Sequence, residues 1–474
     1  MEKVPGFLRF ASPNEQRTIA REHTGVYHAV IIGATYQFDE SFNVHDPSTF
    51  YNALHHCIQE HPFLSVAVGD AHTDKSYYRR VTTTTLKDHI AIVEQSANHD
   101  DNTTIGQMLQ GHLHGTWPEG ISPWKIIVLP LQEACFIAFS FSHAIGDGPT
   151  GLAFHRSFQR GCSRTLYAAR DTRPDTMQNP VTPFPSPFDT PERLPISWGF
   201  LLSPFIAQFL PSMVAEWLGM KASVSPVDSG TWLGAKIPSV EEAASAQSML
   251  VVREVEPRVL VNALQQARKH DAKFTGLFIR CIARALSQTV TDVGVTNFVN
   301  QTAINMRRAA SIPQDEGGMY VSGTYIRYDQ PGAHMAFGGD DWKAARNSTK
   351  QLAESAVQLQ DQAIGLLRYV SSMRKWMLGK FGQTRDCSYE VSNVGVANSN
   401  EHDAGTPRQT KFVFAQPGHV LSAPLAFNVA SVGGGALVYT VTWQAGALDL
   451  GKGSEEEFVT KVCSLLENDL QNLE

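Results

Sequence analysis

Short apolar runs and amphipathic stretches follow one another along the first half of the chain. Runs rich in β-branched and aromatic residues predict strands. Three such runs lie at residues 24–38, 75–86 and 124–142. Between the first two, Phe50, Leu54 and Ile58 recur at helical spacing, and Pro62 predicts the end of that helix. The first half is therefore expected to mix strands with helices.

The second half repeats this mixture, with no fixed-period repeat that would indicate a solenoid. Apolar residues at a spacing of three and four predict helices. These helices are expected at residues 256–270, 273–290 and 340–372. Strand-like runs lie at 248–257, 297–308, 318–329, 387–396, 410–417, 424–434 and 436–448. A last helix is predicted to begin at Ser454, which forms a capping box with Glu457.

Residues 171–195 are crowded with prolines, including the run PVTPFPSPFDTPERLP. Proline lacks a backbone N–H, so this stretch cannot continue a helix or a central strand. We interpret it as the start of a crossover between two halves. The predicted division is a first domain over 1–170, a crossover over 171–230 and a second domain over 231–474.

An apolar segment at 196–220 follows the prolines and begins with the run ISWGFLLSPFIAQFLP. Its single charged residue is Glu216. It is long enough to cross a bilayer, but Pro204 and Pro211 interrupt it. We interpret it as two short helices that pack on the core or line a lipophilic entrance. The alternative is contact with a membrane or lipid surface.

The composition fits a packed globular protein, with 42% hydrophobic and 18% charged residues among 474. The formal net charge is −7 and no long run of Lys or Arg occurs, which argues against a nucleic-acid partner. The six cysteines form no C-x-x-C pair, so reduced thiols are expected rather than a zinc site or a disulfide framework. The N-terminus lacks the apolar run of a signal peptide, and a cytoplasmic protein is expected.

The stretch SHAIGDG combines a strand end, a histidine and a glycine-rich bend. Leaving a strand, His143 could project into a cleft and take a proton from an alcohol or amine near neutral pH. Asp147 is better placed to stabilise the turn by accepting a hydrogen bond from an arginine, and Gly148 would permit the bend. The alternative is a core histidine beside an ordinary turn.

Two other patterns partly resemble a metal site and a nucleotide site. In HHCIQEH, only Cys57 and His61 share a helical i,i+4 relation, so no tetrahedral metal site is predicted. GALDLGKG resembles a phosphate-binding loop, but Gly453 replaces the hydroxyl that would hold magnesium. We therefore expect no metal and no nucleotide site of this type.

SHAIGDGPTGLAF resembles the H-x-x-x-D-G signature of the CoA-dependent acyltransferase superfamily. That superfamily includes chloramphenicol acetyltransferase, the plant BAHD acyltransferases, peptide-synthetase condensation domains and fungal alcohol acetyltransferases. The resemblance continues at 53–64, at 304–313 and at 390–396. Within the second of these, Arg307 matches the arginine that supports the aspartate of the signature.

Two departures narrow the resemblance. Ser142 stands where condensation domains have the first histidine of H-H-x-x-x-D-G. The stretch FVFAQP at 412–417 replaces the D-F-G-W-G motif of the plant enzymes. Both differences favour the fungal alcohol acetyltransferase branch, including the enzymes that act on trichothecenes.

The resemblance implies an α/β fold of two pseudo-symmetric chloramphenicol-acetyltransferase-like domains. Each domain would have a mostly antiparallel mixed sheet with flanking helices, and the active-site channel would run between them. His143 would be the general base for direct acyl transfer, supported by Asp147, Gly148 and Arg307. The oxyanion donor is expected from Ser392 or Asn393, while the residues that bind CoA cannot be assigned.

By the same resemblance, the substrates would be acetyl-CoA or another acyl-CoA and a hydroxylated lipophilic small molecule of secondary metabolism, with no metal. A monomer is expected, with possible lipid contact through 196–220. Two alternatives stay open. One is a carrier-protein-dependent or amide-forming acyltransferase of the condensation type, and the other is a binding or cyclisation protein on the same fold that has lost transfer.

Overall fold

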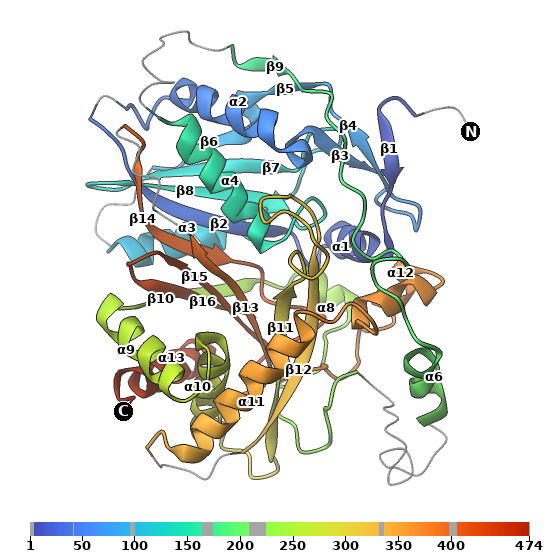
Figure 1. Cartoon of the computed structure of the whole chain (residues 1–474), viewed down its shortest axis with the longest axis vertical. Helices are drawn as coiled ribbons and strands as arrows, with labels where there is room; N and C mark the ends of the chain where they lie inside the picture. The colour runs from blue at the N-terminus through green and yellow to red at the C-terminus, as the bar shows by residue number, and fades with distance from the viewer. Residues whose placement is uncertain are drawn as a thin grey trace.

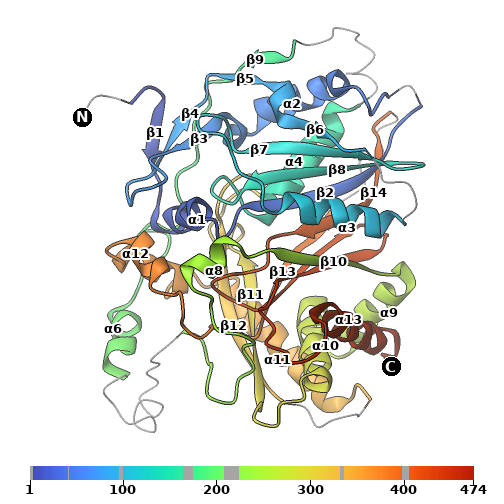
Figure 2. The same ribbon diagram turned by 180° about the vertical axis from the view of Figure 1, so that it is seen from behind.

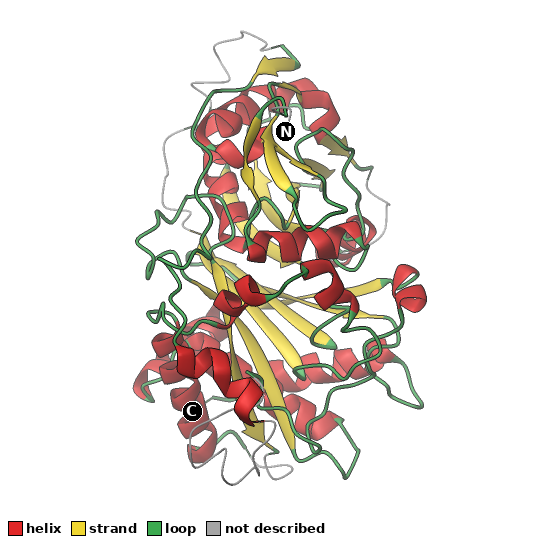
Figure 3. Cartoon of the chain, turned by 90° about the vertical axis from the view of Figure 1, so that its right-hand side faces the viewer, coloured by secondary structure: helices red, strands yellow, loops and turns green. Residues whose placement is uncertain are grey.

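The computed structural model describes residues 4–40, 42–94, 100–163, 174–207, 224–330, 336–397 and 405–473. Two α/β halves follow one another along the long axis of the molecule, with the first half uppermost in Figure 1. Figure 3 shows their strands as separate groups along this axis. The mixed α/β class expected from the sequence is confirmed.

The sheet of the first half has five strands in the order β14-β2-β8-β7-β6. Their bounds are β2 (Ala29–Gln37), β6 (Ile90–Ile92), β7 (Trp124–Pro130), β8 (Cys135–Ser142) and β14 (Arg408–Ala415). All neighbouring strands are antiparallel except β6 and β7. Helices α2 (Tyr51–Glu60) and α4 (Gly148–Gly161) cover one face of this sheet, and α3 (Asp101–His112) covers the other (Figures 1 and 2).

Strand β14 reaches this sheet from the second half of the chain, where it pairs with β2. Its side chains alternate between two buried layers. Phe412 and Phe414 pack under α2 and α4, whereas Val413 and Ala415 pack under α3. Because both faces of this end of the strand are covered, its last four residues form a continuous apolar run rather than an alternating pattern. The exchange of this strand ties the two halves together.

The sheet of the second half has six strands in the order β10-β16-β15-β13-β11-β12. Their bounds are β10 (Ser248–Val255), β11 (Asn297–Asn305), β12 (Val321–Asp329), β13 (Tyr389–Ala397), β15 (Leu425–Val432) and β16 (Leu437–Gln444). Strand β13 is parallel to both of its neighbours, and the other pairs are antiparallel. Each half therefore holds a mixed sheet that is mostly antiparallel.

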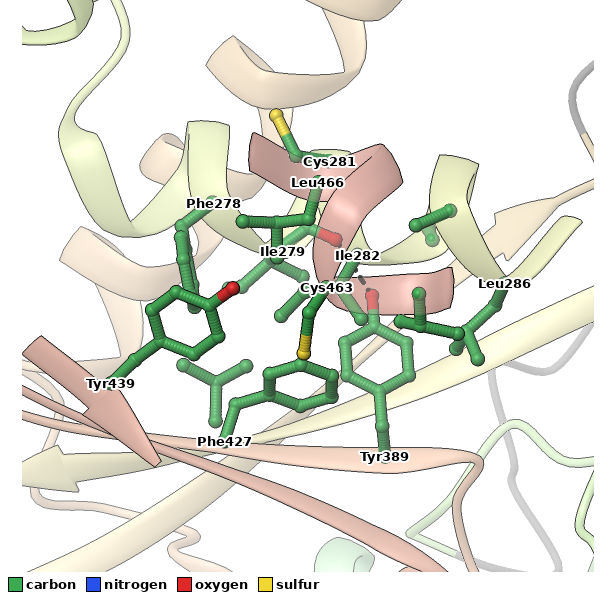
Figure 4. Close-up of a cluster of buried hydrophobic side chains, with 14 of the residues drawn as sticks. Phe278, Ile279, Cys281, Ile282, Leu286, Tyr389, Phe427, Tyr439, Cys463 and Leu466 are labelled. Carbon is green, nitrogen blue, oxygen red and sulfur yellow. Dashed lines mark hydrogen bonds between the residues drawn. The ribbon is translucent and has the colours of Figure 1, made fainter. Parts of the chain in front are cut away.

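Four helices pack on one face of the second sheet: α9 (Pro257–Lys269), α10 (Phe274–Thr289), α11 (Gly339–Ser355) and α13 (Glu455–Gln471). Figure 4 shows this layer, in which Phe278 and Leu466 from the helices face Tyr389, Phe427 and Tyr439 from the strands. The α13 helix begins where expected, and the Ser454 hydroxyl accepts hydrogen bonds from the first-turn backbone N–H groups, which is the N-cap half of the predicted capping box.

The single helix predicted over 340–372 is wrong. Helix α11 ends at Ser355, and a separate 3₁₀ helix follows at η4 (Ala363–Tyr369). Between them, Asp361 adopts a φ of 60°, which a helix cannot accommodate. Its carboxylate accepts hydrogen bonds from the backbone N–H and hydroxyl of Ser197, so a distant contact fixes the break.

Smaller elements complete the chain. Two small sheets have the orders β1-β4-β3 and β5-β9. Their strands are β1 (Phe7–Phe10), β3 (Val66–Gly69), β4 (Tyr77–Arg80), β5 (Thr83–Thr85) and β9 (Thr176–Gln178). The short helices are η1 (Pro47–Phe50), η2 (Pro62–Ser65), η3 (Leu86–His89), α8 (Val240–Ala244) and α12 (Met373–Leu378). Helix α1 (Pro13–His23) lies between the halves and contacts α12 (Figure 1).

The proline-rich crossover runs as an extended chain from β9 down the side of the molecule to α6 (Trp198–Ala207) (Figure 1). Along one edge of α6, Trp198, Leu202 and Ile206 are exposed. The remainder of the predicted apolar segment, 208–220, lies outside the described residues. Within the described ranges, no helix is both long and apolar enough to cross a membrane.

Candidate active site

His143 is the first residue after β8, on the tight turn that leads into α4. Its Nδ1 lies 2.9 Å from the carbonyl oxygen of Gly146. Because a carbonyl can only accept, Nδ1 carries the proton, and the other ring nitrogen, Nε2, keeps its lone pair. The pKa of His143 is lowered to about 4, mainly by burial and to a smaller extent by the Arg21 and Arg17 cations, although the bond to Gly146 opposes this shift. The ring is therefore a neutral base at pH 7.

Asp147 caps the first turn of α4 and is fully buried with Arg307. The two side chains form a bidentate ion pair, with N–O distances of 2.8 and 2.7 Å. The carboxylate also accepts from the Tyr320 backbone N–H at 3.0 Å. Arg307 donates in turn to the carbonyl of Glu316. A loop between β11 and β12 is thus fastened to the turn that carries His143, and both charges are satisfied.

Gly148 is the first residue of α4, and its backbone has no left-handed torsion. The structure gives a different reason for glycine here than the expected bend. A Cβ at this position would lie 2.4 Å from Cγ1 of Val394 on β13. The absence of a side chain lets the second half approach the His143 turn closely.

Strand β13 presents alternate residues to two sides. Val391 packs among the helices of the second half, and the Asn393 amide donates to the Thr275 hydroxyl of α10 at 3.1 Å. Ser392 and Val394 lie on the opposite face, where Val394 meets α4. The structure therefore brings Ser392 to the side of the His143 turn, whereas Asn393 is turned toward α10.

A tyrosine that the sequence did not indicate flanks His143. The Tyr27 ring centre lies 5.4 Å from that of His143 and 5.8 Å from that of His419. Its hydroxyl donates to Gln416 at 2.7 Å. Gln416 donates to Glu390 at 3.1 Å and to Asn428 at 2.6 Å. One polar network thus connects the beginning of β2 with strands β13 and β15 of the other half.

Glu390 is the carboxylate of this network, and its Oε2 lies 3.3 Å from Nε2 of His419. Burial acts to raise its pKa, but the attraction of His419 and the hydrogen bond from Gln416 prevail and hold the pKa at about 2. Glu390 is therefore ionised at every pH of practical interest. Its charge is shared with the cations around it rather than solvated.

Ser142 points to the other side of β8 from His143. Its hydroxyl donates to the carboxyl group of Glu22 on α1. Burial raises the pKa of Glu22 to about 8, although the bond from Ser142 opposes this rise. Glu22, His28 and Ala144 help to line a pocket of about 400 Å³ on this side of the turn. The position occupied by histidine in condensation domains thus has a structural partner here.

Sequence reasoning missed the residues that surround the base: Glu22, Tyr27, Glu390, Gln416 and His419. None belongs to a motif of fixed spacing, since they come from α1, the residues before β2, β13 and the loop after β14. The available signals were Glu390, which opens the stretch 390–396 that resembles the superfamily, and Gln416 in the stretch FVFAQP that departs from the plant motif.

Comparison with known proteins covers almost the whole chain. The family model described as alcohol acetyltransferase matches residues 15–470. The probable alcohol acetyltransferase crmB of Aspergillus fumigatus is 22% identical over 481 residues, which covers 94% of each protein. The solved trichothecene 15-O-acetyltransferase of Fusarium sporotrichioides aligns over 99% of this chain and 98% of its own, with a TM-score of 0.69 and 13% identity.

A second solved structure extends the likeness to condensation domains. The starter condensation domain of rhizomide synthetase, determined in complex with C8-CoA, aligns over 98% of this chain and 96% of its own. Its TM-score is 0.61 and its identity 13%. The two-domain acyltransferase fold expected from the sequence is confirmed. Since the family model spans nearly the full length, this protein belongs to the alcohol acetyltransferase family of acyltransferases.

Proposed function

We propose that this protein transfers an acyl group, most simply acetyl, from acyl-CoA to a hydroxyl of a lipophilic small molecule of secondary metabolism. One observation carries the proposal. The bond from Nδ1 to Gly146 leaves Nε2 of His143 as an acceptor, on a turn that the buried Asp147–Arg307 pair holds rigid. A neutral, oriented imidazole is what deprotonation of an alcohol requires.

The transfer would proceed through one tetrahedral intermediate. Nε2 of His143 removes the hydroxyl proton as the acceptor oxygen attacks the thioester carbonyl, and a C–O bond forms. The Ser392 hydroxyl would donate to the oxyanion. Collapse of the intermediate breaks the C–S bond, and the imidazolium returns its proton to the departing thiolate.

No covalent acyl-enzyme is needed in this scheme. All six cysteines are buried, and burial raises the pKa of each thiol. A thiolate nucleophile would require the opposite environment. Direct transfer between two bound substrates is therefore the simpler mechanism for this chain.

We also propose a lipid contact, an oligomeric state and a location for the enzyme. The exposed edge of α6 is suited to lipid contact, because Trp198, Leu202 and Ile206 recur at a spacing of four along one side. We keep the expectation of a monomeric, cytoplasmic enzyme that needs no metal. A donor held on a carrier protein is the second candidate, favoured by the structural likeness to condensation domains.

The test is release of free thiol from acetyl-CoA in the presence of a panel of lipophilic alcohols, with products identified by mass spectrometry. We expect alcohol-dependent release by the native enzyme. The H143A variant should lose about two to four orders of magnitude in kcat/KM while keeping its melting temperature. Near-full activity in H143A would exclude the mechanism. Activity only with an acyl-carrier protein would replace CoA as the donor.

A further inference from the structure

Two arginines lie one helical turn apart on α1 beside the proposed base. The Arg21 guanidinium carbon is 4.8 Å from the centre of the Tyr27 ring, and the His143 ring centre lies 5.4 Å from the same point. Arg17 precedes it by four residues and so lies on the same side of α1. Both cations lower the pKa of His143, which agrees with their closeness.

Neither arginine has a carboxylate within 4.0 Å among the described residues. Arg21 makes one polar contact there, from Nη2 to Nδ1 of His419 at 3.5 Å. Arg17 has no hydrogen bond within the described part of the chain, and the Nε atoms of both side chains are buried without a partner. A buried guanidinium with unused donors is costly unless a ligand meets it.

The acidic groups nearby are already engaged. Glu390 accepts a hydrogen bond from Gln416 and lies 3.3 Å from Nε2 of His419, while Arg17 and Arg21 interact with its charge only over a longer distance. Asp386 lies 3.9 Å from the ammonium of Lys380 and accepts from the Tyr325 hydroxyl. Lys380 adds a third cation, since Arg21 and Arg17 both contribute to lowering its pKa. The donors of Arg17 and Arg21 therefore remain for an anion that comes from outside the chain.

We propose that Arg17 and Arg21 form an anion subsite for the acceptor, so that the substrate is a hydroxy acid rather than a neutral alcohol. This inference rests on the proposed function. A guanidinium matches a carboxylate in planar, paired geometry. Because the Tyr27 ring neighbours both Arg21 and His143, the carboxylate and the reacting hydroxyl would lie a few bonds apart, with the apolar remainder of the molecule elsewhere.

The test measures binding, without turnover. Hydroxydecanoates with the hydroxyl at C3, C5 or C10 and their methyl esters would be titrated calorimetrically into the native enzyme and the variants R17Q, R21Q and R17Q/R21Q. A matched control is R258Q, because Arg258 is exposed on α9 and pairs there with Glu256. We expect the native enzyme and R258Q to bind the C3 or C5 acid at least tenfold more tightly than its ester. The double variant should lose this preference.

Equal binding of acid and ester by the native enzyme, or an unchanged preference in R17Q/R21Q, would overturn the subsite. The same variants would be titrated with acetyl-CoA and with acetyl-pantetheine, which lacks the nucleotide phosphates. Weaker binding of acetyl-CoA alone would assign the arginines to CoA and would also overturn the proposal. If a glutamine variant fails to fold, R17K and R21K keep the charge and should show a reduced preference.

The outcome is separable from that of the proposed function. A native enzyme that binds the acid selectively but transfers no acyl group would exclude the transferase and leave the subsite. A transferase that acetylates acid and ester with equal kcat/KM in both the native enzyme and R17Q/R21Q would exclude the subsite alone.

Discussion

Two groups of arginines near the His143 turn, Arg307 and the α1 pair Arg17 and Arg21, differ in how their hydrogen-bond donors are used. Arg307 is fully buried and makes two hydrogen bonds to Asp147 and two to the Glu316 carbonyl. Arg17 and Arg21 are also largely enclosed, yet they contact no carboxylate in the described ranges. The first arrangement is complete without a ligand, and the second is not.

This difference helps to decide whether a buried charged side chain stabilises the fold or binds a ligand. A buried guanidinium whose donors are all satisfied contributes rigidity, and its removal leaves a stranded partner. A guanidinium with unused donors contributes little to folding but can recognise an anion. Glu22 is the acidic counterpart of the second case, because it is partly buried beside Ser142 and forms no ion pair with a cation among the described residues.

Breaking the complete pair should have the largest effect on stability. The D147N variant strands Arg307, and we expect a loss of about 3–5 kcal/mol in the free energy of unfolding together with reduced activity. R21Q should cost less than about 1 kcal/mol. Urea unfolding measures both, and D315N, which disrupts only the exposed pair with Arg156, serves as control. Equal losses of unfolding free energy in D147N and R21Q would contradict the distinction between Arg307 and Arg21.

Replacing the Glu22 carboxyl group by a neutral amide should stabilise the folded protein. The pKa of Glu22 is raised in the folded state from its ordinary value of 4.5 to about 8, so folding is penalised increasingly between these two pH values. The E22Q variant should match the native enzyme at pH 4.5 and exceed its stability by up to about 4 kcal/mol at pH 8. Unfolding at both pH values measures this. A pH-independent difference would contradict it.

Close packing of the His143 turn can be tested at Gly148. A Cβ there meets Val394, so G148A should cost about 1–3 kcal/mol, and the added change V394A should restore part of it. The control is G111A on α3, where a Cβ meets nothing within 4 Å. That variant should gain about 0.5–1 kcal/mol from helix propensity. Both values come from thermal unfolding, and a neutral G148A would refute the close approach.

Removing Arg21 should change the pKa of His143 by a small amount. Since the pKa of His143 is lowered to about 4, activity should be half-lost near pH 4 rather than near 6.5. Arg21 contributes to this lowering, so R21Q should move the acid limb of kcat/KM upward. Melting temperatures at the same pH values separate unfolding from titration. An acid limb near 6.5 in the native enzyme would mean that the ring is solvated.

The motif residues of the first half could be recognised from sequence because their relations are local. His143, Asp147 and Gly148 sit on one turn, and the strand and helix around them follow from hydrophobic periodicity. Arg307 lies 160 residues away, and its assignment depended on the resemblance to the acyltransferase superfamily. The division of the chain at 171–230 stays a prediction.

Other parts of the site depended on tertiary contacts. Periodicity predicted β14 as a strand but could not show that it joins the first sheet, because an apolar run does not specify which neighbour covers it. The same limit applied to the predicted helix over 340–372, because α11 ends at Ser355 and the contact of Asp361 with the distant Ser197 leaves no trace in the periodicity.

By itself, the sequence determined the fold class, the helices and strands with strong periodicity, and the turn that carries the base. Only the tertiary structure decided which face of β13 meets that turn, and so separated Ser392 from Asn393. It also decided which arginines have partners, since the resemblance indicated a partner for Arg307 but the sequence did not indicate whether Arg17 and Arg21 have one. Charge and hydrogen bonding depend on what surrounds a group in space, and that environment comes from segments far apart along the chain.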